Sequence, residues 1–171
     1  MVDRPSGRNE TEDERLDRNL GELLQELRVA LPGVQVLFAF LLAVPFQRNF
    51  TEITSFEKGV YFGTLLCTAI SAALLIAPSA YHRLTFHYQH KRQLVFLANR
   101  FAIAGLAFLA LAMTGAIVLI TDVLFGAAAV TAVTGAVAIS MFALLWALLP
   151  LRQRARYEAE GLRRDDRPAG R

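Results

Sequence analysis

The chain has 171 residues, of which 54% are hydrophobic, and its formal net charge is +3 at pH 7. Its polar residues gather in residues 1–28 and 152–171, and we expect no separate soluble catalytic domain outside the apolar part. The basic residues lie beside apolar segments, where anionic lipid headgroups are found, and this distribution argues against a nucleic-acid partner.

Residues 1–11 are predicted to form a disordered tail, and residues 12–30 an amphipathic helix on the cytoplasmic side. Leucines recur there at spacings of four and three and so share one helical face: Leu16, Leu20, Leu23, Leu27 and Leu31. This stripe is compatible with a helix lying on the bilayer or against the protein's own cytoplasmic loops. A short coiled coil with a partner is the alternative, because the stripe is narrow and rich in leucine.

Four apolar segments are predicted to cross the membrane: residues 30–46, 59–78, 97–120 and 123–149. Pro32 is compatible with a first helical turn or a bend at the start of the first span, and prolines also stand at the ends of spans: Pro45, Pro78 and Pro150. Residues 79–96 are basic and contain no acidic residue, and we expect them to form an interfacial helix.

The last two spans share one apolar run, residues 101–149, in which Asp122 is the only charged residue. A single helix of that length would measure roughly 73 Å, against ~30 Å for the hydrocarbon core of a bilayer. A charged aspartate at the middle of a span would cost about 2.5–3.5 kcal/mol. We therefore expect a tight hairpin turn at Thr121-Asp122, at an aqueous surface, with one of the two residues capping the following helix.

The predicted fold class is all-α, a membrane four-helix bundle with an amphipathic N-terminal helix and an interfacial helix between spans two and three. Lys and Arg are concentrated in the N-terminal segment, in the connector after span two and in the basic C-terminal tail, residues 151–171. The positive-inside rule then places both termini in the cytoplasm.

Several polar residues are candidates for a function. Those near the cytoplasmic ends of the spans are candidates for binding anionic headgroups: Arg28, Gln35, His82, Arg83, Asn99 and Arg100. Arg28, Gln35 and the His82-Arg83 corner would form a polar vestibule, although Gln35 is also compatible with an interhelical hydrogen bond. The other histidines of the connector are His87 and His90. Metal binding and pH-sensitive lipid contact are alternatives for these histidines, but no Cys or acidic residue accompanies them, and we expect no metal site.

Small and weakly polar residues in the second span favour close helix packing. Thr64, Thr68 and Ser71 form a stripe at helical spacing, and Gly59 and Gly63 form a G-x-x-x-G pair. A polar permeation path along the stripe is the alternative. The hydroxyl residues in the spans have no neighbouring base, and no glycine-rich phosphate loop follows a strand, so we expect neither enzymatic activity nor a cofactor. The prediction is a protein that acts through lipid or protein contacts, as a homo-oligomer or with a membrane-protein partner.

Two segments, residues 28–46 and 77–83, resemble a bacterial family of small four-helix integral membrane proteins, common in actinobacteria, whose function is uncharacterised. The resemblance covers residues 16–149 and implies the same fold in a bacterial plasma membrane. Members are often labelled automatically as sodium:proton antiporters, so the resemblance implies proton-coupled sodium antiport, by this chain or with it as a subunit, as the alternative function. Established antiporters carry buried acidic residues, which the predicted spans lack at mid-depth.

Overall fold

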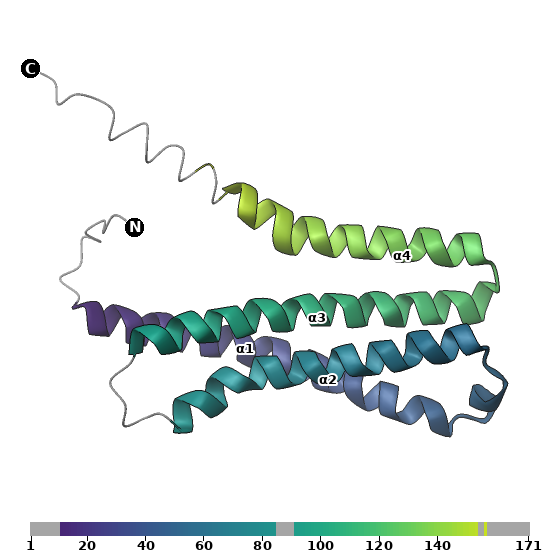
Figure 1. Ribbon diagram of the computed structural model, residues 1–171, viewed down its shortest axis with the longest axis horizontal. Coiled ribbons are helices and arrows are strands. Elements are labelled where there is room, and N and C mark those ends of the chain that lie inside the picture. Colours follow the sequence, from purple (N-terminus) through teal and green to yellow (C-terminus); the bar gives the residue numbers. More distant parts are fainter. Residues whose placement is uncertain (1–10, 85–90, 154–155, 157–171) are drawn as a thin grey trace, which may run out of the picture. The chain divides into compact units, whose positions relative to one another are not determined.

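The computed structural model describes residues 11–84, 91–153 and 156, so that most of both predicted tails lies outside the described residues. Helices make up nearly all of this part, and it contains no strand (Figure 1). The elements in chain order are α1 (Glu12–Ala43), the 3-10 segments η1 (Val44–Phe46) and η2 (Arg48–Glu52), α2 (Ser55–Leu84), α3 (Lys91–Phe125), α4 (Ala128–Phe142) and the π-helical segment η3 (Ala143–Leu148). The predicted all-α class is confirmed.

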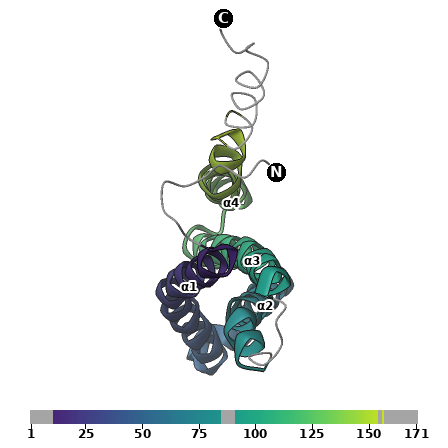
Figure 2. The same cartoon turned by 90° about the vertical axis from the view of Figure 1, so that its left-hand side faces the viewer.

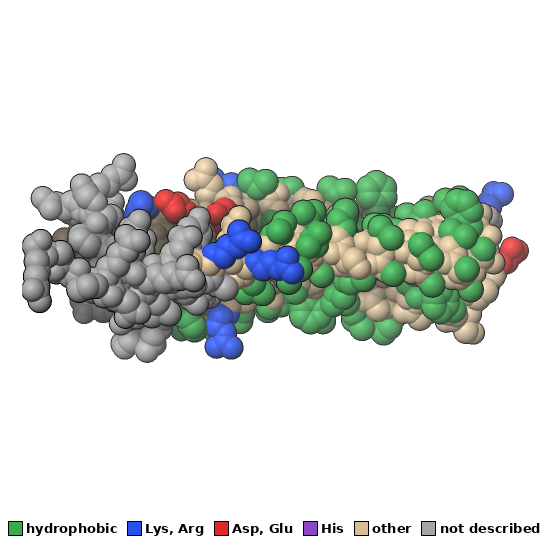
Figure 3. Space-filling view, turned by 90° about the horizontal axis from the view of Figure 1, so that it is seen from above, with side chains coloured by type: hydrophobic (Ala, Val, Ile, Leu, Met, Phe, Trp, Pro, Cys, Tyr) green, Lys and Arg blue, Asp and Glu red, His purple; other side chains and the backbone are tan. Residues whose placement is uncertain are grey.

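Four helical segments are long and apolar enough to cross a membrane: Glu14–Phe46, Ser55–Tyr81, Leu94–Phe125 and Ala128–Gln153. Large apolar side chains remain exposed on them, as at Phe40 (70% exposed) and Val137 (64% exposed). Figure 3 shows such side chains along the visible helical surface. Extensive exposed apolar surface is typical of a protein that contacts lipid, which agrees with the predicted membrane bundle.

The helices α1 and α2 begin with the same side-chain arrangement. Glu14 N–H donates to Thr11 Oγ1 at 3.3 Å, and Thr11 N–H donates to the Glu14 carboxylate at 2.9 Å. Thr54 and Glu57 repeat this exchange at the start of α2, with distances of 3.2 and 2.6 Å. Each capping box pairs backbone N–H groups that the first turn of a helix leaves without partners.

The predicted amphipathic helix (residues 12–30) and most of the first span (30–46) form one continuous helix, α1, which has Pro32 in its interior and ends at Ala43. An interior proline costs about 3 kcal/mol, because it removes a backbone hydrogen bond and crowds the preceding turn. Packing on both sides of Pro32 offsets this cost, since Leu27 and Val34 are both buried in the hydrophobic core.

The leucine stripe of α1 packs within the chain itself. Leu20 and Leu27 are buried, and Leu23 and Leu31 pack against the core cluster. Much of the stripe is therefore buried against other helices of the same chain. The stripe packs against the helical core of the first unit, which differs from the predicted contact with the bilayer or with cytoplasmic loops, and a coiled coil with a partner stays a prediction.

The chain divides into two compact units, Met1–Met113 and Thr114–Arg171, with the boundary inside α3. In the first unit, α1, α2 and the first part of α3 lie side by side (Figures 1 and 2). Their core cluster consists of Leu27, Val34, Leu75, Ala102 and Leu109. At Gly105 of α3 an added Cβ would lie 2.7 Å from Leu75 Cδ2, so the close approach of α3 to α2 requires glycine there.

The segment that follows the second span differs from its prediction as one interfacial helix (residues 79–96). Helix α2 continues past Pro78 to Leu84, and α3 begins at Lys91, so that most of the segment belongs to the ends of these two helices. Residues 85–90 lie outside the described part of the chain. Pro150 also lies within helical residues, just after the π-helical segment η3, and helix continues beyond it to Gln153.

In the second unit, the predicted turn at Thr121-Asp122 is corrected. Both residues lie inside α3, and the turn falls about one helical turn later, at Gly126-Ala127. Gly126 adopts φ +58°, a left-handed conformation that glycine reaches at little cost, and its N–H donates to the Asp122 carbonyl at 2.8 Å. The conformational freedom of glycine therefore fixes the turn, and the charge at Asp122 does not.

Asp122 has a different role from the predicted helix cap. Ala127 occupies the N-cap position of α4 and makes no side-chain hydrogen bond there. The Asp122 carboxylate instead accepts a hydrogen bond from the hydroxyl of Thr131, in the first part of α4, at 2.9 Å. This bond links α3 to α4 across the turn.

Candidate functional site

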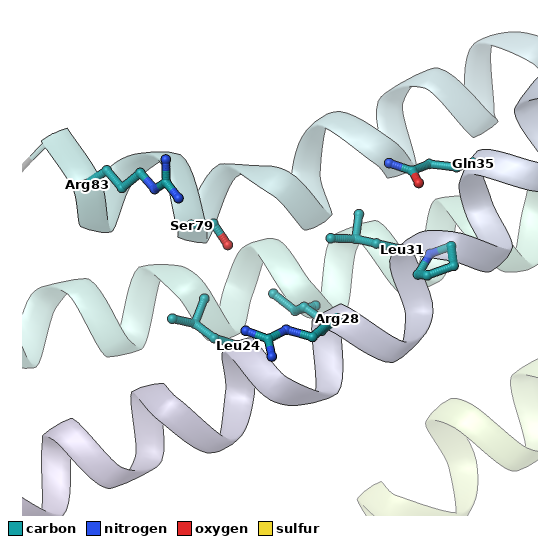
Figure 4. A pocket seen from close by; sticks show the side chains of 8 residues that line it. Leu24, Arg28, Leu31, Gln35, Ser79 and Arg83 are labelled. Atoms are coloured by element: carbon teal, nitrogen blue, oxygen red, sulfur yellow. The ribbon is translucent and has the colours of Figure 1, made fainter.

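A pocket of about 420 Å³ lies between α1 and α2 in the first unit (Figure 4). Its lining comes from both helices: Leu24, Leu27, Arg28, Leu31, Pro32, Gln35, Ser79 and Arg83. Most of the α1 positions recur at spacings of three and four residues, and Ser79 and Arg83 are four residues apart on α2. Each helix therefore turns one continuous face toward the pocket.

The lining of the pocket carries two positive charges and no acidic side chain. Arg28 on α1 and Arg83 on α2 are both exposed, as is Gln35, whereas Ser79 is half-buried. None of these four polar side chains has a hydrogen-bond or ion-pair partner among the described residues. The pocket therefore presents unpaired cations and hydrogen-bond donors beside a wall of leucines.

A proline lies inside each of the two helices that form the walls of the pocket. Pro32 lies in α1 and Pro78 in α2, next to Ser79. A proline has no N–H, so the carbonyls four residues earlier, those of Arg28 and Leu74, lose their usual helical donor. Both walls thus have a weakened hydrogen-bond ladder where the polar side chains of the pocket are placed.

The structure brings together only part of the predicted headgroup-binding set. Arg28, Gln35 and Arg83 line the pocket, whereas Asn99 and Arg100 are exposed on α3 and do not line it. His82 lies in α2, but its side chain is outside the described part, as are His87 and His90. Within the described ranges, no three His, Cys, Asp or Glu side chains could hold a metal ion.

Ser79 and the leucine wall were missed by the sequence-based prediction. A signal for Ser79 was present, because it precedes Arg83 by four residues and so shares its helical face. The leucines were interpreted as an amphipathic stripe. That some of them also line a pocket depends on how α1 pairs with α2.

The predicted intramembrane stripe is buried and its hydroxyl groups are already engaged. Thr64 and Thr68 donate to the carbonyls of Val60 and Thr64 at 2.7 and 2.8 Å. Ser71 donates to the carbonyl of Gly105, on α3, at 2.8 Å. These contacts favour the packing interpretation over a permeation path.

The G-x-x-x-G pair behaves differently from the hydroxyl stripe. A Cβ added at Gly59 or at Gly63 would meet no other atom within 4 Å, and both glycines are exposed. They therefore take no part in close helix packing among the described residues.

Four apolar helices, with a basic pocket between the first two, define a multi-pass helical membrane protein by length and composition. Within this class, the chain matches a family of unknown function, DUF6328, over residues 9–150, and it belongs to that family. No curated protein and no solved structure matches the chain. The family match covers both the pocket and the turn at Gly126, in agreement with the predicted resemblance to an uncharacterised family.

Proposed function

We propose that this protein is non-enzymatic and binds anionic membrane lipids through the pocket between α1 and α2, on the cytoplasmic side of a bacterial plasma membrane. The observation that carries the proposal is the pair of unpaired guanidinium groups, Arg28 and Arg83, which two different helices bring to one pocket without an acidic neighbour in its lining. Basic pockets between membrane helices are typical binding sites for anionic lipid headgroups.

Arginine suits this role better than a general positive patch would. A guanidinium remains charged at all physiological pH values and can donate two parallel hydrogen bonds to one phosphate. Two such groups on separate helices can hold a phosphate from two sides. A headgroup bound in this way would link α1 to α2 at their weakened, proline-containing segments.

The charge pattern of the whole chain supports the cytoplasmic assignment. Arg28 follows an N-terminal segment that holds four further arginines, although acidic residues outnumber them there, and Arg83 lies in the basic connector that also contains Lys91 and Arg92. The positive-inside rule places such segments in the cytoplasm. The pocket would then face the cytoplasmic leaflet, where anionic lipids attract basic residues by about 1 kcal/mol for each Lys or Arg.

The proposal is tested by the lipids that remain bound to the purified protein. Native mass spectrometry should show that the wild type retains phosphatidylglycerol in preference to phosphatidylethanolamine. Arg28→Ala and Arg83→Ala should each weaken this preference about fivefold, and the double variant should abolish it. Arg48→Ala is the matched control, because Arg48 is an exposed arginine in η2, outside the pocket.

Two results would contradict the proposal. One is a wild-type protein that retains both lipids equally. The other is a double variant that keeps the preference while its helical circular dichroism and thermal unfolding are unchanged. Loss of binding counts as support only if the double variant unfolds like the wild type.

Proton-coupled sodium antiport is the alternative that the family resemblance implies. It would require an ionisable group on a path through the membrane. In the described part of the chain, Asp122 lies near the end of α3 and accepts a hydrogen bond from Thr131. Glu57 is held in the capping box at the start of α2. We rank antiport second, and sodium-dependent proton flux in reconstituted vesicles that contain a pH-sensitive dye would reverse this order.

A further inference from the structure

We infer that the pocket holds a complete diacyl glycerophospholipid, taken from the bilayer. Arg28 and Arg83 bind its phosphate. Ser79 donates a hydrogen bond to the same phosphate, Gln35 donates one to an ester carbonyl, and the apolar face of α1 beyond Gln35 contacts the acyl chains. This inference rests on the proposed function and deepens it, because it names the lipid class and the part of the lipid that each residue recognises.

The order of chemical groups along the pocket is the first observation. On α1, Gln35 comes seven residues after Arg28, which is roughly 10 Å further along the helix toward the apolar part. On α2, which runs back in the opposite direction, Ser79 lies one turn, roughly 6 Å, deeper than Arg83. Figure 4 shows Arg83 and Gln35 at opposite ends of the pocket. Figure 4 also shows Ser79 between Arg83 and Arg28 along the pocket, so Ser79 lies with the two arginines in the outer part, and Gln35 lies in the inner part.

A glycerophospholipid carries its groups in the same order: a charged phosphate, then two ester carbonyls, then hydrocarbon. Ester carbonyls accept hydrogen bonds and donate none. The Gln35 amide can donate. Helix α1 thus places a donor at the depth where this lipid has only acceptors.

The second observation is that Ser79 and Gln35 have no hydrogen-bond partner among the described residues, whereas Ser71 of α2 has one. Ser71, two turns from Ser79 on α2, donates to the Gly105 carbonyl. Ser79 and Gln35 have no such acceptor in the part of the chain that the structure describes. A polar group in an apolar environment is costly without a hydrogen bond, so an acceptor supplied by lipid would stabilise both side chains.

The third observation is the apolar surface that continues inward from the polar residues. Seven residues beyond Gln35 and on the same face of α1, Leu42 is exposed. A soluble anion would need only the two arginines, whereas this sequence of surfaces fits an anion that is attached to hydrocarbon chains.

The test compares two lipids that differ only at the carbonyls. Purified protein is titrated with dioleoyl phosphatidylglycerol and with its ether-linked analogue, which keeps the phosphate and the chains but has no ester carbonyl. Native mass spectrometry should show that the protein binds the ester lipid between about twofold and tenfold more tightly, the range of one net hydrogen bond. The variant Gln35→Leu/Ser79→Ala should lose this discrimination and keep its preference for anionic over zwitterionic lipid.

The control variant, Gln47→Leu/Ser140→Ala, makes the same substitutions at exposed positions outside the pocket and should bind like the wild type. Equal binding of ester and ether lipids, with the anionic preference intact, would overturn this inference and leave the proposed function standing. A wild type with no anionic preference would overturn both. Displacement of the lipid by glycerol phosphate at equal concentration would show a site for soluble anions and would also overturn the inference.

Discussion

Two stretches of α2 use polar side chains in different ways. Thr64, Thr68 and Ser71 are buried, and each hydroxyl donates to a backbone carbonyl. Ser79 and Arg83 lie nearer the end of the helix, where they line a pocket without partners among the described residues. The first stretch stabilises the protein, and the second is available for a ligand.

The difference arises from what lies opposite each stretch. Gly105 has no side chain, so α3 approaches α2 closely and presents its carbonyl to Ser71. Ser79 faces the pocket, whose opposite wall on α1 carries Arg28 and Gln35. A polar residue in a membrane helix therefore contributes to packing or to binding according to its neighbour across the interface. The following substitutions should separate stability from lipid binding on this basis.

The largest effect on stability is expected for Gly105→Ala. The new Cβ would lie 2.7 Å from Leu75, whose side chain is fully buried and cannot move away easily. Overpacking of this kind costs about 1–3 kcal/mol, measured as the free energy of unfolding in detergent. Gly63→Ala is the matched control, since its Cβ would meet nothing within 4 Å and alanine favours helix by up to about 1 kcal/mol. Equal effects of the two substitutions would show that α2 and α3 do not approach closely at Gly105.

A smaller loss is expected for Thr131→Val, which tests packing in the second unit. The substitution removes the hydrogen bond to the Asp122 carboxylate and should cost about 1 kcal/mol of unfolding free energy. Thr134→Val is the control, because Thr134 is half-buried on the same helix and has no hydrogen-bond partner in the described residues. In a double-mutant cycle with Asp122→Ala, strictly additive losses would mean that the two side chains do not interact.

The sequence was sufficient for the number of helices and for the charged part of the site. Long apolar runs between arginine-rich segments predict four membrane helices, and the position of Arg28 and Arg83 at the ends of such runs predicts a shared polar site. Local signals failed where tertiary contacts decide. Pro32 was placed at the start of a span, but packing of Leu27 and Val34 on both sides keeps the helix continuous.

The turn between α3 and α4 was predicted from the wrong signal. The charge of Asp122 was given more weight than the backbone freedom of Gly126, although both residues were visible in the sequence. A bond to Thr131 allows Asp122 to remain inside the last turn of α3. The hydrogen bond between Asp122 and Thr131 cannot be predicted until it is known how α3 and α4 pack together. The same holds for Ser79, which belongs to the site only because α1 lies opposite.

Ser71→Ala should reduce the free energy of unfolding by less than Gly105→Ala or Thr131→Val does. It removes an interhelical hydrogen bond to the Gly105 carbonyl, and bonds of this kind between membrane helices contribute about 0.6 kcal/mol on average. Lipid retention should not change, because Ser71 does not line the pocket. A shift in lipid binding comparable to that of Arg83→Ala would contradict the separation between the two stretches of α2.

Ser79→Ala should have the smallest effect on stability, within about 0.5 kcal/mol of the wild type in lipid-free detergent. Ser79 donates no hydrogen bond to a described residue, so its removal breaks no contact within this part of the chain. With bound phosphatidylglycerol the comparison changes, because a ligand stabilises the folded state in proportion to its affinity. The lipid should therefore raise the melting temperature of the wild type more than that of Ser79→Ala. It should raise the melting temperatures of the wild type and of Ser71→Ala by the same amount. If the lipid instead stabilises Ser79→Ala and the wild type alike, Ser79 takes no part in binding, and the pocket recognises the lipid through its arginines alone.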